Sequence, residues 1–470
     1  MNSLWSKIVE FFKRIFGPNS QTIPPEVANQ DANLTVWWDV YRAKAPWLPY
    51  QFITADGKRR TRNRLTLNPA KIIVSELAGL IVAEGPEIRA NEALAAILDE
   101  CDFWTNLRRS TEYQLALGGQ AIKIYRQDGK VQFDFVRAFN FIPLKWSNRQ
   151  VTEAAFVDRR AVGNKTYTRV ETHRKAEENG IAGYRIESKA LDADTGQQVS
   201  LSIAWGDLQE SVFVPTDLPL FAYIANPEAN NIDPESPLGI SVYQNALDTI
   251  QAMDIAFDGY RTEMVLGRQR VALPSTVMRG YMDPETGARK LGFDPSDEAY
   301  IRLEGDDADK LKPVDLSGAL RMGEWKQAIQ IGLDLLCLQT GFSSGFFQFD
   351  GASGVKTATE VIAENSRTYK TVQGQKDTIR AALEPLFSTA AGLAGAPVDV
   401  EIVFPDSVIE DRNAQAAYHA GLVGAGLEDK TSAIMAVHRL LEDEAQIMAD
   451  KIKEETKPAP MPDIFGGAGA

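Results

Sequence analysis

Two long amphipathic stretches, separated by an insertion, constrain the fold of this chain most. Ser241–Gly267 contains no proline, and a helix of that length would measure about 40 Å at 1.5 Å per residue. Its apolar residues recur every three or four positions, the pattern of a helix packed along its length: Leu247, Ile250, Met253, Phe257, Tyr260 and Met264. The opposite face is polar: Gln244, Asp248, Gln251, Asp258 and Thr262. We expect a second helix over Ala319–Thr340, ended by Gly341, and strands and turns between the two helices.

The first 225 residues predict an α+β domain. Helices are expected around Trp37–Tyr41, from Pro69 with Asn68 as N-cap, and over Glu92–Glu100 and Phe103–Leu117. The pattern then changes to period two, with an Asp128-Gly129 hairpin turn between Ala121–Tyr125 and Val131–Val136. Further alternating runs complete an antiparallel meander: Glu153–Ala161, Thr166–Thr172, Tyr184–Ser188 and Val199–Ile203. Helices followed by such a meander indicate the α+β class.

The C-terminal part is mostly helical. Asn226–Gly239 contains three prolines and cannot be a helix. A third long helix is expected from Lys356 towards Gly392, kinked or interrupted near Pro385. After it we expect a strand over Val398–Phe404, helices over Ile409–Ala420 and Lys430–Glu454, and a disordered tail.

The charge balance restricts how the chain can treat nucleic acid. It has 50 basic and 64 acidic residues, a net charge of −14. Tight nucleic-acid binding depends on Lys and Arg neutralising phosphates, so this balance argues against it but allows DNA to slide past. Cys101 and Cys337 are the only cysteines, which excludes a disulfide framework and indicates a reducing compartment.

The N-terminus permits two interpretations. Within Met1–Gly17, Trp, Phe and aliphatic residues recur at helical spacing with basic residues between them. Such a helix could lie on a membrane surface, but amphipathic helices more often pack on protein, so we favour a docking helix. The charges exclude a signal peptide, and no segment is apolar enough to span a membrane.

Strings that resemble catalytic or cofactor motifs lack the spacing or the structural context that those motifs require, so we expect no catalytic residue, metal or cofactor. His173, His419 and His438 are too far apart in sequence to form a helical ligand pair. Gly341–Gly345 spells G-x-S-x-G, but it follows a helix where a nucleophile elbow requires a strand. In Gly351–Thr357 the lysine is displaced from its place in a phosphate loop. A scattered carboxylate site remains an alternative without positive support.

Several motifs, taken in order, resemble the portal proteins of long-tailed double-stranded-DNA phages. The likeness is closest at Thr340–Asp350 and at Lys356–Val361, and it extends to Asn68–Ala78, Gly426–Ser432 and Asp443–Ala445. The order of helix, small β-rich insertion, helix, glycine- and phenylalanine-rich loop and long helix is also similar. The resemblance covers about residues 30–455.

The resemblance implies a portal fold with these segments: an N-terminal helix and linker (1–32), an α/β wing (33–235), stem helix 1 (236–267), a clip (268–318), stem helix 2 (319–340), a tunnel loop (341–355), a long wing helix and strand (356–408), a helical crown (409–455) and a tail (456–470).

The resemblance also implies which residues meet DNA. The tunnel loop would face it: Phe342, Ser343, Ser344, Gly345, Phe346, Phe347, Gln348, Phe349, Asp350, Gly351, Ala352, Ser353 and Gly354. The polar face of stem helix 1 would line the channel. The family's characteristic helix start would be Lys356, Thr357, Ala358, Thr359, Glu360 and Val361. Four phenylalanines in such a loop must pack either in their own subunit or against a neighbour.

As function, the resemblance implies a non-enzymatic ring of about twelve subunits at one capsid vertex of the virion. Double-stranded DNA would pass through it without sequence specificity. Its partners would be the major capsid protein, the terminase motor, a head-completion or tail-connector protein and a scaffolding protein, with synthesis in the host bacterial cytoplasm. Another virion head or connector protein and a peripheral membrane protein are the alternatives.

Overall fold

The computed structural model describes residues 30–53, 57–82, 85–266, 271–274, 279–282, 287, 289–292, 300–303, 314–315, 319–348, 358–404, 412–438 and 442–455. Met1–Gly17, the linker that follows it and the tail from residue 456 lie outside them. The chain forms two compact units, one of residues 1–352 and 367–404 and one of residues 353–366 and 405–470. Among the described residues, no helix is both long and apolar enough to cross a membrane.

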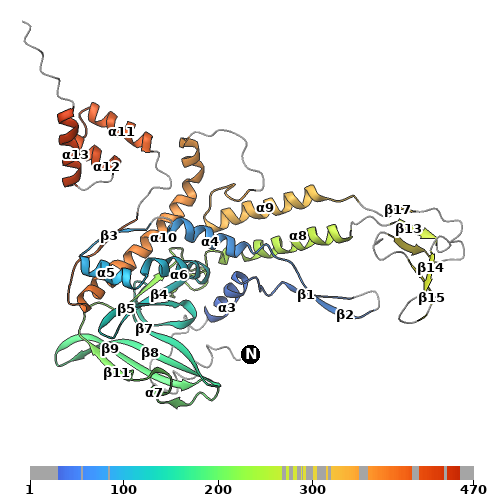
Figure 1. Cartoon of the computed structure of the whole chain (residues 1–470), viewed down its shortest axis with the longest axis horizontal. Coiled ribbons are helices and arrows are strands. Elements are labelled where there is room, and N and C mark those ends of the chain that lie inside the picture. Colours follow the sequence, from blue (N-terminus) through green and yellow to red (C-terminus); the bar gives the residue numbers. More distant parts are fainter. Residues whose placement is uncertain are drawn as a thin grey trace, which may run out of the picture. The chain divides into compact units, whose positions relative to one another are not determined.

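Four helices of the first unit form the expected helical part (Figure 1): α3 (Gln30–Tyr41), α4 (Pro69–Ile81), α5 (Glu92–Glu100) and α6 (Phe103–Leu117). Trp37, Ile73 and Leu77 are almost fully buried between them. Asn91 caps α5 by accepting a hydrogen bond from the Leu94 amide at 3.0 Å. Asn68 is the N-cap of α4 and Pro69 lies in its first turn, as predicted, but Asn68 has a φ of 51° and its side chain donates to the Tyr41 carbonyl and does not cap the helix.

The predicted hairpin is confirmed as β4 (Gly119–Gln127) and β5 (Lys130–Arg137). Asp128 and Gly129 both have positive φ, 52° and 79°, as a type I′ turn requires. Strand β12 (Phe221–Ala225) pairs with the other edge of β4. The segment after β12 is not helical, as predicted, and it crosses the end of α6 so closely that a Cβ on Gly118 would lie 2.4 Å from the Gly239 carbonyl oxygen.

The predicted meander is a six-stranded antiparallel sheet: β6 (Phe141–Ser147), β7 (Gln150–Val162), β8 (Lys165–Glu178), β9 (Ile181–Asp192), β10 (Gln198–Val199) and β11 (Ser211–Val214), with both β10 and β11 on β9. The predicted strand Val199–Ile203 is wrong beyond Val199, because Ser202–Trp205 forms the short helix α7. That turn brings Leu201 and Trp205 onto Tyr167 and Ala190, an apolar cluster that a straight strand could not cover.

The two long helices are confirmed as α8 (Leu247–Leu266) and α9 (Met322–Thr340), and the residues that the structure describes in the insertion between them include five short strands. Strand β13 (Val271–Pro274) lies between β16 (Tyr300–Leu303) and β17 (Val314–Asp315), and β14 (Arg279–Met282) pairs with β15 (Arg289–Gly292). Helix α8 begins later than predicted. A 3₁₀ turn, Gln244–Ala246, precedes it because Tyr243 is completely buried there and donates to the Trp37 carbonyl at 2.8 Å.

Helix α10 (Ala358–Leu393) includes Pro385 without the predicted interruption. Strand β18 (Glu401–Val403) pairs with β3 (Glu87–Arg89). In the second unit, α11 (Arg412–Gly424) is followed by α12 (Lys430–His438) and α13 (Glu442–Glu455). The prediction of one helix over Lys430–Glu454 is therefore wrong: Thr431 donates to Gln446 at 3.1 Å, a contact that requires α12 and α13 to fold back on each other.

Candidate functional site

Helices α8 and α9 pack side by side and run in opposite directions (Figure 1). Two glycines allow the close approach. A Cβ on Gly332 of α9 would lie 2.5 Å from the Met253 side chain of α8, and a Cβ on Gly259 of α8 would lie 2.5 Å from the Trp325 ring of α9. The predicted apolar seam thus becomes a helix pair whose spacing is set by two residues without side chains.

A polar cluster joins the two helices near the insertion. The Arg321 guanidinium lies 2.7 Å from the Glu263 carboxylate, and Trp325 Nε1 donates to the same carboxylate at 3.0 Å. The hydrogen bonds from Arg321 and Trp325 lower the pKa of Glu263 to about 2. Glu263 therefore stays ionised at neutral pH and fixes the start of α9 against the end of α8.

A two-stranded hairpin, β1 (Pro49–Ile53) and β2 (Arg59–Asn63), contacts α8 on a different side. Arg62 lies 2.6 Å from the Asp258 carboxylate, and Trp47 Nε1 donates to Asp254 at 2.9 Å. Burial raises the pKa of Asp254, although the hydrogen bond from Trp47 opposes that shift. A hollow of about 550 Å³ separates the hairpin from the helix pair, lined by Tyr50, Arg62, Arg64, Asp258, Glu263 and Arg321 among others.

The loop after α9 begins inside the protein. Gly341, with a φ of 82°, ends α9 as predicted. Phe342 and Ser343 are 1% and 3% exposed, and Phe342 packs against Phe346 and Phe347 with ring centroids 4.8 and 5.1 Å away. The Ser343 hydroxyl accepts a hydrogen bond from Thr368 of α10 at 3.1 Å, so this serine has a structural role.

The comparisons with known proteins identify the family. A family model described as "Phage portal protein, SPP1 Gp6-like" matches residues 23–459. The chain belongs to this family. It is a portal protein, a component of phage particles, and the resemblance drawn from the sequence is confirmed.

Two solved structures are similar to this portal protein at low identity. One, titled "Virion of native gene transfer agent (GTA) particle", is 12% identical with a TM-score of 0.44, over 79% of this chain and 89% of that one. The other, "Neck of native GTA particle computed with C12 symmetry", is 13% identical with a TM-score of 0.44, over 78% and 89%. No curated protein matches the chain.

The predicted channel face of stem helix 1 needs correction at two of its five residues. Asp258 is 6% exposed and bound to Arg62, and Gln244 lies in the 3₁₀ turn, where it accepts a hydrogen bond from Trp37 Nε1. Asp248 is exposed, and Gln251 and Thr262 are partly exposed. The helical repeat could not reveal these partners, because Trp37 and Arg62 lie about 200 residues earlier in the chain.

The predicted tunnel loop also needs correction at its start. Phe342 and Ser343 cannot face DNA, because both are buried in their own subunit. Ser344 and Gln348 are exposed, and Gly345, Phe346 and Phe347 are partly exposed. Residues 349–354, together with Lys356 and Thr357 of the helix-start motif, lie outside the described residues, whereas Ala358–Val361 form the first turn of α10.

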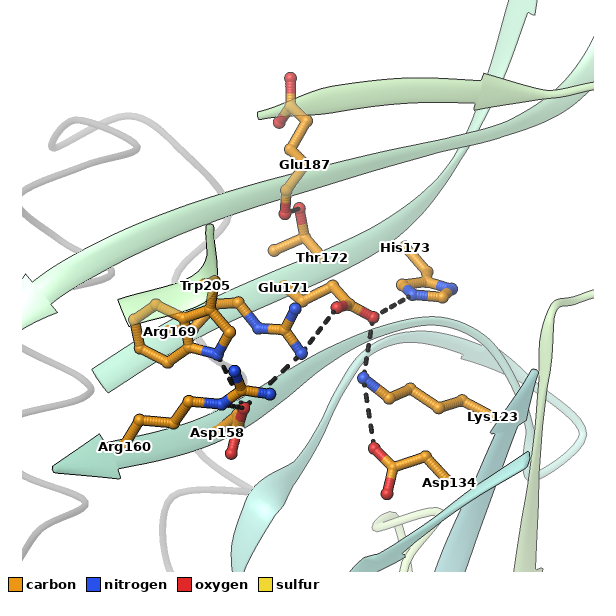
Figure 2. A network of polar contacts seen from close by, with 10 residues as sticks. All are labelled: Lys123, Asp134, Asp158, Arg160, Arg169, Glu171, Thr172, His173, Glu187 and Trp205. Atoms are coloured by element: carbon orange, nitrogen blue, oxygen red, sulfur yellow. Dashed lines mark hydrogen bonds and ion pairs between the residues drawn. The ribbon is translucent and has the colours of Figure 1, made fainter. Parts of the chain in front are cut away.

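The sequence patterns did not reveal a buried charge network that joins β4 of the three-stranded sheet to β8 of the six-stranded sheet (Figure 2). The Glu171 carboxylate lies 3.0 Å from the Lys123 amine, 3.2 Å from the Arg169 guanidinium and 2.9 Å from His173 Nε2. Burial alone would raise the pKa of Glu171, but the His173 hydrogen bond and the charges of Lys123 and Arg169 hold it well below its usual range. Burial lowers the pKa of His173.

Charged residues in alternating strands usually indicate a solvent-facing side, which is why this network gave no recognisable signal. Its buried position between the two sheets indicates a structural role. Within the portion of the chain that the structure describes, no group of three or more His, Cys, Asp or Glu side chains is arranged to hold a metal ion.

Helix α9 has an exposed apolar stripe. Ile331, Leu335 and Leu338 are 60%, 44% and 57% exposed. They recur at i, i+4 and i+7, so they form one face of α9, distinct from the face of Trp325, Ile329, Gly332 and Leu336 that packs inward. Such a continuous exposed stripe is typical of a protein interface.

Proposed function

We propose that this portal protein assembles into a closed ring of about twelve subunits at one capsid vertex, and that double-stranded DNA passes through the ring during packaging and ejection. The observation that supports assembly is the exposed stripe of Ile331, Leu335 and Leu338 on stem helix 2. A ring requires a surface on each subunit that is buried only by its neighbour, and this stripe has that character.

The proposed role for DNA is passage without retention. The net charge of −14 keeps phosphate binding weak, since few counterions would be released on contact. We assign no enzymatic reaction to the chain: ATP hydrolysis would belong to the terminase motor that docks on the clip. The head-completion or tail-connector protein would later replace the terminase on the clip. The major capsid protein and a scaffolding protein would contact the ring during assembly in the host cytoplasm.

Electron microscopy of negatively stained protein tests the assembly. The purified chain should form rings with a central channel. Leu335→Glu should reduce the fraction of chains in rings by about tenfold or more, the effect expected when a central interface residue is lost. Thr105→Glu, on the exposed face of α6, is the matched control and should leave rings intact. A wild-type chain that stays monomeric under assembly conditions would contradict the proposal.

The tunnel-loop assignment has its own test. A deletion of residues 349–353 spares the buried Phe342 anchor and the partly buried Phe346 and Phe347. Rings should therefore form normally, while packaging or retention of DNA in an in vivo complementation assay should fall. Normal packaging by the deleted chain would show that this loop does not act on DNA.

A further inference from the structure

The outer half of the β1–β2 hairpin is exposed, whereas its inner half packs on its own subunit. Tyr50, Arg62 and Arg64 are partly buried, with Arg62 bound to Asp258 of α8. The outer residues of both strands are exposed on both faces of the hairpin: Gln51, Phe52, Ile53, Arg59, Arg60 and Thr61. A two-stranded hairpin gains little stability by itself in water, so an outer half of this kind is expected to pack on a further surface.

The hairpin is the chain's concentrated basic segment. Residues 58–64 contain five basic and no acidic side chains, so the remaining sequence carries a net charge of −19 against −14 for the whole. Arg62 pairs with Asp258, and Arg64 donates to the Trp47 carbonyl at 2.6 Å. Arg59 and Arg60 form no ion pair with any side chain of the described residues, and both are exposed. Phe52 and Ile53 beside them are 38% and 68% exposed.

A groove of matching character lies along α9. It has a volume of about 310 Å³ and is lined by Ile331, Asp334, Leu335, Leu338, Phe342, Ser344 and Arg367. Arg367 donates to the Leu338 carbonyl at 2.6 Å. Asp334 lies in the groove, and Glu324 is exposed further along the same helix. The α9 groove is thus an apolar channel with one carboxylate, Asp334, and one guanidinium, Arg367, in its lining, and α9 itself also exposes Glu324 and Lys326.

We propose that the β1–β2 hairpin of one subunit docks in the α9 groove of the next subunit, with Ile53 on Leu335 and Leu338, and with Arg59, the cross-strand partner of Ile53, and the neighbouring Arg60 near Asp334 and Glu324. This inference rests on the proposed ring. A ring needs two different, complementary surfaces on each subunit, and the hairpin and the groove are such a pair.

The hairpin cannot use its own groove. It is fixed to α8 through Arg62 and Asp258, while the residues that line the groove lie on the face of α9 that does not contact α8. DNA is a less suitable partner, because phosphates would pair with Arg59 and Arg60 but leave Phe52 and Ile53 in water. An acidic second copy satisfies both kinds of side chain.

Charge reversal tests the docking. Arg59→Glu with Arg60→Glu should lower the ring fraction roughly tenfold or more, because like charges would then face each other across the interface. Adding Glu324→Arg and Asp334→Arg to the same chain should restore rings. Arg108→Glu with Arg109→Glu, an exposed pair on α6, makes the same charge change and should have no effect. Unchanged thermal unfolding of each monomer shows that the variants fold.

Disulfide trapping locates the contact. Ile53→Cys with Leu335→Cys in one chain should give a ladder of linked subunits on a non-reducing gel, whereas either cysteine variant alone should not.

The outcomes separate the docking from the proposed function. If the wild-type chain forms rings, but the ladder is absent and the Arg59→Glu, Arg60→Glu chain still assembles, the docking is wrong while the proposed function stands. If those reversed rings instead lose affinity for linear DNA in a gel-shift assay, the hairpin serves nucleic acid. Absence of rings in the wild type would refute the proposed function itself.

Discussion

At the scale of residues, a charge network joins two sheets, so that only folding can assemble it. Lys123 lies on β4, and Glu171 and His173 lie on β8 (Figure 2). The side chain of Lys123 is 5% exposed and that of Glu171 is 12% exposed. In such surroundings an ion pair contributes little net stability, but removing one partner leaves a buried charge uncompensated.

We therefore predict that Glu171→Gln lowers the free energy of unfolding by about 3 kcal/mol, measured by urea denaturation, because Lys123 would keep only Asp134, 3.5 Å away. Glu100→Gln breaks the exposed Lys130–Glu100 pair, which spans 2.8 Å, and is the control. It should cause no measurable change. If both substitutions lowered the free energy of unfolding equally, the buried position of Glu171 would not be what makes it important for stability.

The same network should make the fold sensitive to acid. The pKa of His173 is depressed by burial, so the unfolded chain takes up a proton there that the folded chain does not, and stability falls as pH drops below about 6.5. The depressed pKa of Glu171 adds a further loss below about pH 4.5. The thermal midpoint of the wild type should fall between pH 7.5 and pH 5.5.

His173→Gln keeps a donor for Glu171 without a group that titrates in that range, so its thermal midpoint should change less with pH. If the two chains responded identically to acid, His173 would not be the group responsible.

At the scale of elements, the packing of α8 against α9 depends on two glycines. Gly259→Ala would place a methyl group against the rigid Trp325 ring, with 2.5 Å available. It should cost about 1–3 kcal/mol of stability, as overpacking does. Gly323→Ala, on α9 with nothing within 4 Å of the new Cβ, should be neutral or stabilising by up to about 1 kcal/mol. Chemical denaturation of both variants distinguishes them; a harmless Gly259→Ala would mean that the helices are not packed as described.

The elements also show what the sequence could predict. Segments governed by local rules were predicted well: α5 and α6 with the glycine after it, and the Asp128-Gly129 hairpin, whose residues favour positive φ. Errors arose where distant contacts decide. Ser202–Trp205 became a helix to cover Tyr167, and Lys430–Glu454 became two helices because they pack on each other.

The same holds for the candidate site. Helical spacing identified the seam from Leu247 to Met264, but it placed Asp258 on an open face, since Arg62, its partner, lies on a hairpin 196 residues away. The phenylalanines of the loop required packing partners, and the structure supplies them for Phe342 within the subunit itself.

At the scale of the whole molecule, this portal protein has outward features that become useful only in an assembly. An apolar stripe on α9, a basic hairpin and an acidic remainder of the chain are poorly suited to a free monomer but suited to a closed ring. The contacts within the sheets and between α8 and α9 hold each subunit together, so assembly should not require refolding.

The mass of the assembled particle tests this most directly. Native mass spectrometry of the 470-residue chain, 51.8 kDa per subunit, should give one dominant species near twelve subunits, about 620 kDa, that persists on dilution. A spectrum dominated by monomer or dimer, or a continuous ladder of masses as open filaments produce, would contradict the closed ring and with it the proposed path for DNA.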